Sequence, residues 1–441
     1  MYFDPHCDYL YLFSFLYFDC VHQLDDDQLE RFVLNDLKNL ESQKNFYHPY
    51  VASKRIINLV LLWSSRDNFD GASKIHVMQQ IHKDCSYLYE NIEYHIDGNH
   101  LLTNYAALAI YERFLFDNQK SKYFNKYLSE FSSQFEKGLH YERSISYTSQ
   151  LLHESFLVFQ LYKSDTPSST FSLIDKSLQS LRFFENLGNR VDFGDNIFEQ
   201  SFKLDHLTDL YSRAFQIPFE FEEPESPAII SDYVSIFNND FSVCVDCGSP
   251  SPVFQPGHAH DSSGAIELSF RSSKIFISGN VSTYENCERR LMERSRFNYS
   301  KVVSEGSFQN VWSSFRVAQR VRPRHISSRN NVTCVIARGT HGFERSVFLT
   351  QNGVSIVDST AGSEGVISQF IVSGNCAVSI INSHNIVIDC GCFQLALCSS
   401  GAMTIEDKNI AIRFGVREAT KLIKCTTNQT ENILNIRENH L

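Results

Sequence analysis

The first half of the chain follows a helical pattern of apolar positions. Leu29, Phe32, Val33, Leu37 and Leu40 recur at the spacing that gathers side chains on one face of a helix. The acidic run 25–27 precedes this stripe, and negative charge favours a helix N-terminus. Similar apolar runs predict further helices at residues 56–63, 102–110, 151–162 and 181–187. Glycine and proline are sparse here, so we expect long helices joined by short loops.

The pattern changes at the segment 220–227, which is acidic and contains Pro224 and Pro227, and we interpret it as a linker. Beyond it, apolar and polar residues alternate with a period of two, which is typical of strands. Asn352-Gly353 predicts a tight hairpin turn between two of them. Strands are predicted at residues 241–245, 266–270, 274–278, 333–337, 346–349, 354–357, 377–381 and 385–389. Without intervening helices, such strands form an antiparallel sandwich. We therefore predict a helical domain at 1–222 and a β-sandwich domain at 223–441.

Composition narrows the possible partners. The formal net charge of -11 argues against general nucleic-acid binding, which needs a basic surface. An acidic polymer would need a local concentration of cations, and the stretch 289–324 holds nine Lys and Arg against Glu293 and Glu305. This stretch is either a solvated surface or the wall of a cleft for an anionic glycan.

The cysteines and the N-terminus bear on location. Twelve cysteines are scattered without a regular framework, and Cys390-Gly391-Cys392 is too tight for a zinc knuckle. We interpret most of them as free, buried thiols in a reducing compartment. The start of the chain lacks a basic region and a cleavage site, so we expect a cytoplasmic protein, or a periplasmic one if a leader is missing. The apolar run 9–18 is too short to span a bilayer and is predicted to be a buried helix.

Two motifs about forty residues apart carry candidate chemistry. The first is Asn99-His100-Leu101-Leu102, and the second runs from His140 to Tyr147 and includes Arg143. Together they supply an amide, an imidazole, a guanidinium and a phenol, which can neutralise a carboxylate and move a proton beside it. Taken alone, each has a structural alternative, since an Asn-His pair often caps a helix and a tyrosine often packs in a core.

In this order and spacing, the two motifs resemble those of the heparinase II/III-like polysaccharide lyases. The resemblance runs from about Tyr47 to about Asp358 and includes shorter pieces at 47–50, 193–196, 245–248, 256–261 and 312–316. It implies an (α/α) toroid followed by a C-terminal antiparallel β-sandwich. It also implies cleavage of a glycosidic bond beside a uronic acid by β-elimination, with an acidic polysaccharide or oligosaccharide as partner and no membrane insertion.

The resemblance also assigns roles to residues. Asn99 and His100 are expected against the substrate carboxylate, and Tyr147 is expected to be the catalytic tyrosine. A free phenol titrates near ~10, and Arg143, one turn earlier if the segment is helical, is expected to lower that pKa. The expected substrate-binding residues are His258, His260, Tyr299, Arg294, Trp312 and Arg316, with the two histidines completing the base or binding sugar.

Three positions depart from the family pattern. Thr148 stands where a histidine usually follows the catalytic tyrosine, the stretch 277–280 lacks the usual aspartate, and Tyr299-Ser300 replaces a His-Asn pair. Some members bind zinc through a histidine, that aspartate and that later histidine. Because two of the three ligands are missing, we predict no zinc here and no other cofactor.

These losses leave three functions open. The first is a lyase acting on a uronate-containing glycan, which we expect to serve surface-polysaccharide metabolism in a bacterium. The second is a uronate C5-epimerase-like enzyme, which needs the same proton abstraction without loss of the leaving group. The third is a catalytically decayed protein that binds or assembles glycans.

Overall fold

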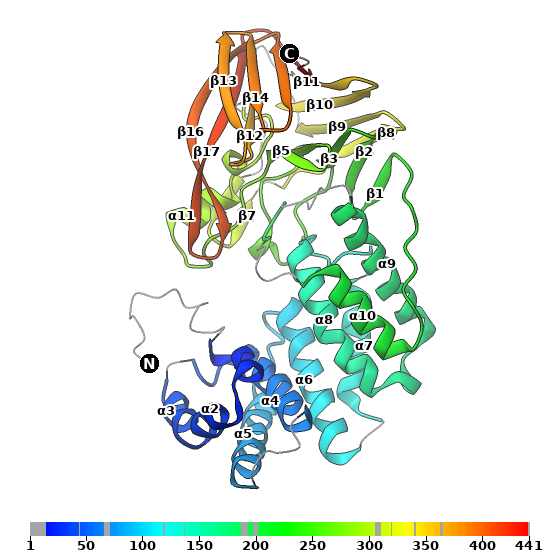
Figure 1. The fold of residues 1–441 in the computed structure, drawn as a ribbon, viewed down its shortest axis with the longest axis vertical. Helices are drawn as coiled ribbons and strands as arrows, with labels where there is room; N and C mark the ends of the chain where they lie inside the picture. Colours follow the sequence, from blue (N-terminus) through cyan, green and yellow to red (C-terminus); the bar gives the residue numbers. More distant parts are fainter. Residues whose placement is uncertain are drawn as a thin grey trace. The chain divides into compact units, whose positions relative to one another are not determined.

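The computed structural model describes residues 15–43, 45–65, 71–117, 120–135, 137–186, 193–196, 202–304, 310–318, 320–338, 341–361 and 365–439 (Figure 1). The chain divides into two compact units. The first comprises Met1–Glu136, Ser149–Asp175 and Asp205–Phe219, and the second comprises Lys137–Thr148, Lys176–Leu204 and Glu220–Leu441. The domain boundary expected between residues 222 and 223 stays a prediction.

The N-terminal half is helical, as predicted. Its elements are η1 (Asp19–Gln23), α2 (Asp26–Arg31), η2 (Phe32–Asp36), α3 (Leu37–Glu41), α4 (Pro49–Ser65), α5 (Gly71–Glu90), α6 (Gly98–Phe116), α7 (Lys122–Gln134), α8 (Ile145–Leu161), η3 (Lys163–Asp165), α9 (Ser168–Asn186) and α10 (Leu204–Phe215). The acidic start predicted for the first stripe is confirmed, because the Asp25 carboxylate accepts a hydrogen bond from the Gln28 amide at 2.8 Å and caps α2. Most of the apolar run 9–18 lies outside the described residues, as does Leu187.

The second unit contains two eight-stranded antiparallel sheets. In spatial order, the first sheet consists of β1 (Ala228–Ile230), β2 (Tyr233–Phe237), β3 (Phe241–Asp246), β4 (Ile266–Phe270), β5 (Ser273–Ile277), β12 (Val366–Val372), β17 (Val416–Thr427) and β16 (Ala402–Arg413). The second consists of β13 (Ala377–Asn382), β14 (Asn385–Asp389), β15 (Gln394–Ser399), β18 (Glu431–Glu438), β11 (Gly353–Thr360), β10 (His341–Thr350), β9 (Asn331–Arg338) and β8 (Arg324–Ser328). The predicted hairpin at Asn352-Gly353 joins β10 to β11, where Thr350 pairs with Gly353.

Shorter elements complete this unit. They are a two-stranded ribbon of β6 (Asn310–Ser313) and β7 (Arg316–Ala318), the helix α11 (Glu288–Arg294), and the single turns η5 (Pro256–His258) and η6 (Arg296–Asn298). The segment predicted to be a linker, 220–227, carries no helix or strand.

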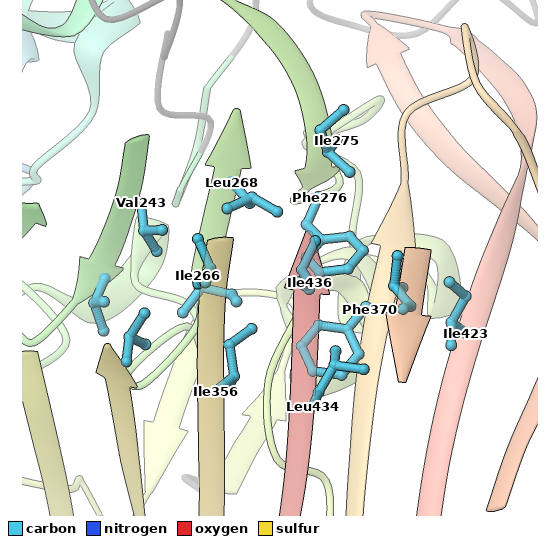
Figure 2. Packing of buried hydrophobic residues seen from close by; sticks show 14 of the residues in the cluster. Val243, Ile266, Leu268, Ile275, Phe276, Ile356, Phe370, Ile423, Leu434 and Ile436 are labelled. Carbon is cyan, nitrogen blue, oxygen red and sulfur yellow. The ribbon is translucent and has the colours of Figure 1, made fainter. Parts of the chain in front are cut away.

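The apolar core of the second unit lies between the two large sheets. Figure 2 shows Val243, Leu268 and Phe276 from the first sheet near Ile356 and Ile436 from the second. All five are at most 2% exposed. Alternating strand residues from the two sheets thus bury one another's apolar faces, which confirms the predicted sandwich.

A buried ion pair crosses the second sheet. Arg345 on β10 donates to both carboxylate oxygens of Asp358 on β11, at 2.6 and 2.7 Å, and is fully buried. Its remaining nitrogen donates to the carbonyls of Gly264 and Ser300 at 3.2 and 2.8 Å. With both partners this well hydrogen-bonded, the cost of burying the two charges is compensated.

Two further observations concern membranes and thiols. In the part of the chain that the structure describes, no helix combines the length and the apolarity needed to cross a bilayer. Ten of the cysteines are free thiols, and five of these ten are buried.

We expect Arg345→Leu to destabilise the protein by about 3–5 kcal/mol, because Asp358 would stay buried without its partner. Urea denaturation followed by circular dichroism measures this loss. The matched control is Arg271→Leu, which removes a half-exposed arginine paired with Asp240 and Glu438 and should change stability far less. Equal effects of the two variants would contradict the prediction.

Candidate active site

The segment 137–148 is held in the second unit by one arginine. Arg143 donates through Nη2 to Asp246, through Nε to the Ser231 carbonyl at 2.8 Å and through Nη1 to the Ser249 carbonyl at 3.2 Å. A Cβ atom on Gly248 would lie 2.3 Å from this guanidinium. Within the motif 245–248, the Asp246 carboxylate pairs with Arg143, and the lack of a side chain at Gly248 leaves room for the guanidinium.

The role predicted for Arg143 is wrong. Arg143 lies in a turn with φ of 62°, before α8 begins at Ile145, so it does not stand one helical turn before Tyr147. Its guanidinium is occupied by Asp246 and two carbonyls. The pKa of Tyr147 is raised well above its usual value, by burial first and by the neighbouring Tyr284 second. Tyr147 is therefore a neutral phenol at ordinary pH.

The motif 193–196 and two hydroxyls define the start of α8. Asn196 Oδ1 accepts from the Ser146 amide at 3.0 Å, and Ser144 Oγ accepts from the Tyr147 amide at 3.2 Å. Thr148 Oγ1 accepts from the His140 amide at 2.9 Å and donates to the Ser144 carbonyl at 2.8 Å. The bonds from the Ser146 and Tyr147 amides satisfy groups that a helix N-terminus leaves unpaired, and they help to determine where Tyr147 lies.

Tyr147 is the centre of a cluster within the second unit. Its hydroxyl is 2.9 Å from the Tyr284 hydroxyl, and its half-buried ring stacks on His258 with centroids 5.3 Å apart. His258 Nδ1 lies 2.9 Å from Glu142 Oε2, and Nε2 lies 3.9 Å from Asp195 Oδ2. Burial opposes charge on His258, but Glu142 and Asp195 outweigh it and raise the pKa of the imidazole.

A second group of buried polar residues surrounds Asp195. Arg290 donates to both of its carboxylate oxygens at 2.7 Å, and His260 Nε2 lies 2.5 Å from Oδ1. The Tyr299 hydroxyl donates to His260 Nδ1. Burial works to raise the pKa of Asp195, but Arg290 and the two histidines hold it well below its usual range. Burial lowers the pKa of His260 to about 4, so this imidazole is neutral.

These histidines do not fit a zinc ion. Both ring nitrogens of His260 are engaged, by Asp195 and Tyr299, and His258 Nδ1 is engaged by Glu142. Across the described residues, no three or more His, Cys, Asp or Glu side chains come together in a way that would hold a metal. Tyr299, at the position of one of the missing ligands, instead supplies a hydroxyl to His260.

The other predicted substrate-binding residues differ in solvent exposure. Arg294 is fully buried and donates to the carbonyls of Pro256, Ala259 and Ser313 at 2.7 Å, which positions the segment carrying His258. Trp312 on β6 is 67% exposed, and Arg316 on β7 is exposed. The basic stretch 289–324 is thus partly internal: its buried cations are Arg290, Arg294 and Lys301.

Asn99 and His100 belong to the first unit, in the first turn of α6. Asp97 precedes the helix and accepts from the Gly98 amide at 2.9 Å. His100 Nδ1 lies 2.9 Å from Glu93 Oε1, and its ring stacks on Tyr50 with centroids 4.3 Å apart. Asn99 is 7% exposed. The roles predicted for Asn99 and His100 stay predictions.

Sequence reasoning missed four members of the cluster. Glu142 and Asp195 lie inside motifs that it had singled out, so their charge was a signal that pointed to the site. Arg290 lies in the basic stretch and was not distinguished from its neighbours. Tyr284 lies in no motif, and only its hydrogen bond to Tyr147 identifies it.

Comparison with known proteins agrees with this fold. Residues 230–426 match the family described as "Heparinase II/III-like, C-terminal". Comparison with curated protein sequences finds no match. A crystal structure of heparinase III superposes with a TM-score of 0.76 at 14% identity, over 97% of this chain and 76% of that one.

Two further structures support the same fold. A second heparinase III gene product gives a TM-score of 0.66 at 15% identity, over 97% of this chain and 74% of that one. A heparan sulfate lyase from Pedobacter heparinus gives 0.60 at 12% identity, over 98% and 76%. The resemblance to the heparinase II/III-like lyases is confirmed, and so is the fold class: a helical toroid followed by an antiparallel β-sandwich. The chain thus has the fold of polysaccharide lyases.

We expect Glu142→Gln to lower the pKa of His258, because it removes the carboxylate that stabilises the imidazolium. NMR titration of the imidazole protons measures this pKa directly. The control is Glu285→Gln, at an exposed residue beside Tyr284 that should leave the titration unchanged. An unchanged His258 pKa in Glu142→Gln would contradict the assignment of Glu142 as its partner.

Proposed function

We propose that the protein is a polysaccharide lyase that cleaves a uronate-containing acidic glycan by β-elimination. One observation carries the proposal: the Tyr147 phenol is hydrogen-bonded to Tyr284 and stacked on His258, which is itself bound to Glu142. A proton donor and a proton acceptor therefore lie side by side. The similar structures are named as heparinase III and heparan sulfate lyase, which supports an acidic substrate.

In the proposed reaction, His258 acts as the base and Tyr147 as the acid. Glu142 occupies Nδ1 of His258, which leaves Nε2 to take the proton from C5 of the uronate. The electron pair of that C–H bond forms a double bond between C4 and C5, and the bond from C4 to the glycosidic oxygen breaks. Tyr147 donates its proton to this oxygen, and the raised pKa of the phenol suits an acid.

The products of this step are an imidazolium at His258 and a phenolate at Tyr147. The hydrogen bond from the Tyr284 hydroxyl stabilises the phenolate. Return of the proton from His258 to Tyr147, across the stacked pair, restores the starting state. Tyr284 is thus a positioning residue for the acid.

Neutralisation of the substrate carboxylate is assigned to Asn99 and His100. The Asn99 amide is a hydrogen-bond donor, and the first turn of the 19-residue helix α6 carries partial positive charge. Lowering the charge on the carboxylate makes the proton at C5 more acidic. Cytoplasmic location and a part in surface-polysaccharide metabolism remain expectations.

The test is incubation with a panel of uronate polymers, following the ultraviolet absorbance of the unsaturated product. We expect product with the wild-type protein and a loss of about 10²–10⁴-fold in Tyr147→Phe, because the general acid is removed. Tyr94→Phe, at a residue that is 58% exposed, is the control and should retain activity.

If the folded wild-type protein forms no unsaturated product from any polymer in the panel, the lyase proposal fails. Deuterium uptake at C5 without chain cleavage would instead assign the site to an epimerase-like reaction. Glycan binding that survives Tyr147→Phe, without any reaction in the wild type, would indicate a binding protein.

We expect kcat/KM to rise with pH through the pKa of His258, which lies above 6.5, because only the neutral imidazole accepts a proton. The pKa of Tyr147 lies above 10.0, so no fall in rate is expected below that pH. In Glu142→Gln, the rise should move to lower pH. A pH profile of the wild type with its maximum below pH 6.5 is incompatible with His258 as the base.

A further inference from the structure

Two cysteines face each other at the open end of the β13–β14 hairpin. The last registered pair of this hairpin is Ala377 with Asp389. Cys376 directly precedes Ala377 and Cys390 directly follows Asp389, so the two cysteines occupy the next facing positions. Facing residues of an antiparallel pair have Cα atoms about 4.5–5.5 Å apart, which lies within the range of about 4.4–6.8 Å that a disulfide requires.

The two side chains also point to the same side of the sheet. Side chains alternate along a strand, so Cys376 shares a face with Val378, and Cys390 shares a face with Ile388. Val378 and Ile388 are paired across the hairpin. Both cysteines pack against the apolar core to which Ile388 belongs. The two thiols are in direct contact, because Cys390 donates a hydrogen bond to the Cys376 sulfur.

Solvent access distinguishes this thiol pair from a second one in the same unit. Cys247 and Cys334 are also hydrogen-bonded to each other, but they are only 3% and 0% exposed. A reagent in solution therefore cannot reach them in the folded protein. Cys376 and Cys390 are half-buried, at the edge of the core. They combine proximity with access, which are the two requirements for oxidation of a thiol pair in the native state.

The hydrogen bond between the thiols also decides which of them reacts first. The bond from Cys390 lowers the pKa of the Cys376 thiol. Because the thiolate is the nucleophile in thiol–disulfide exchange, Cys376 is the attacking residue. The same bond, ahead of burial, raises the pKa of Cys390. Cys390 therefore keeps its proton until Cys376 has lost its negative charge to a new bond.

We propose that Cys376 and Cys390 form a thiol-oxidation site, which becomes a reversible disulfide by exchange with a small disulfide such as oxidised glutathione. The Cys376 thiolate attacks one sulfur of the reagent and releases a small thiolate, which takes up the proton that Cys376 has lost. Cys390 then loses its proton and attacks the Cys376 sulfur, and the second small thiolate leaves and takes up that proton. Two protein thiols are oxidised to one disulfide, and the small disulfide is reduced to two thiols.

The new bond would fix a connection between the two large sheets. The segment 373–376 joins β12, in the first sheet, to β13, the outermost strand of the second sheet, and Cys390 begins the turn between β14 and β15. A disulfide ties this connection to that turn and restricts separation of the edge strand from its neighbour. β13 and β14 carry none of the residues assigned to the reaction, so the oxidation site is independent of the proposed function.

Mass spectrometry of the oxidised protein tests the proposal. The folded full-length chain is incubated with oxidised glutathione and then denatured in N-ethylmaleimide, which blocks every remaining thiol. Cleavage before Asp389 and after Phe393 places Cys376 on one peptide and both Cys390 and Cys392 on another. Without reduction, we expect these two peptides to be linked, with fragmentation assigning the bond to Cys390. Treatment with dithiothreitol before the blocking step should remove the link.

Three variants separate the steps of the exchange. Cys390→Ser should retain glutathione on Cys376 as a mixed disulfide, because the second thiol is missing. Cys376→Ser should form no link. The matched control is Cys398→Ser, which removes an exposed thiol on β15 of the same sheet and should leave the link unchanged.

Three results would overturn the proposal. In the wild type, they are recovery of both cysteines blocked by N-ethylmaleimide, a link from Cys376 to Cys392, and oxidation of the buried pair Cys247 and Cys334 to the same extent. The last result would show that access does not select the site. No turnover is measured here, so a failure of the lyase proposal would be seen separately.

Discussion

The ion pair between Arg143 and Asp246 is the contact on which the candidate active site depends. It joins the segment 137–148 to strand β3, and that segment carries both Glu142 and Tyr147. The Tyr233 hydroxyl donates to the Arg143 carbonyl at 2.9 Å, and the guanidinium lies 4.2 Å from the centroid of the Tyr233 ring. These contacts offset the unfavourable left-handed backbone of Arg143 and the desolvation of its charge. A residue expected to act on the proton chemistry therefore acts by positioning the residues that carry it.

Burial and neighbouring charges also distinguish His258 from His260, which is two residues further along the chain. His260 is fully enclosed by Asp195 and Tyr299, and burial keeps it neutral. His258 is 23% exposed in its side chain, and Glu142 favours its charged form. Arg290 pairs with Asp195 and offsets its negative charge. Asp195 therefore raises the pKa of His258 less than Glu142 does. One imidazole is structural, and the other is available for chemistry.

Much of the fold could be predicted because its signals are local. The period-two strands at 266–270 and 385–389 match β4 and β14, and Asn352-Gly353 forms the hairpin between β10 and β11. The candidate site was harder to predict from the sequence than the fold. Glu142 and Asp195 lay within recognised motifs, but Tyr284 had no signal, and the charge of Arg294 gave no indication that it is buried among carbonyls.

The sequence by itself determined the order of helices and strands, the position of the tight turn and the motifs that resemble the lyases, because each depends on residues close together in the chain. Tertiary structure alone decided which cations of the stretch 289–324 are buried, which histidine can be charged and in which direction the pKa of Tyr147 moves. These outcomes depend on desolvation and on partners distant in sequence, such as Glu142 for His258 and Tyr284 for Tyr147. No local pattern encodes such pairings.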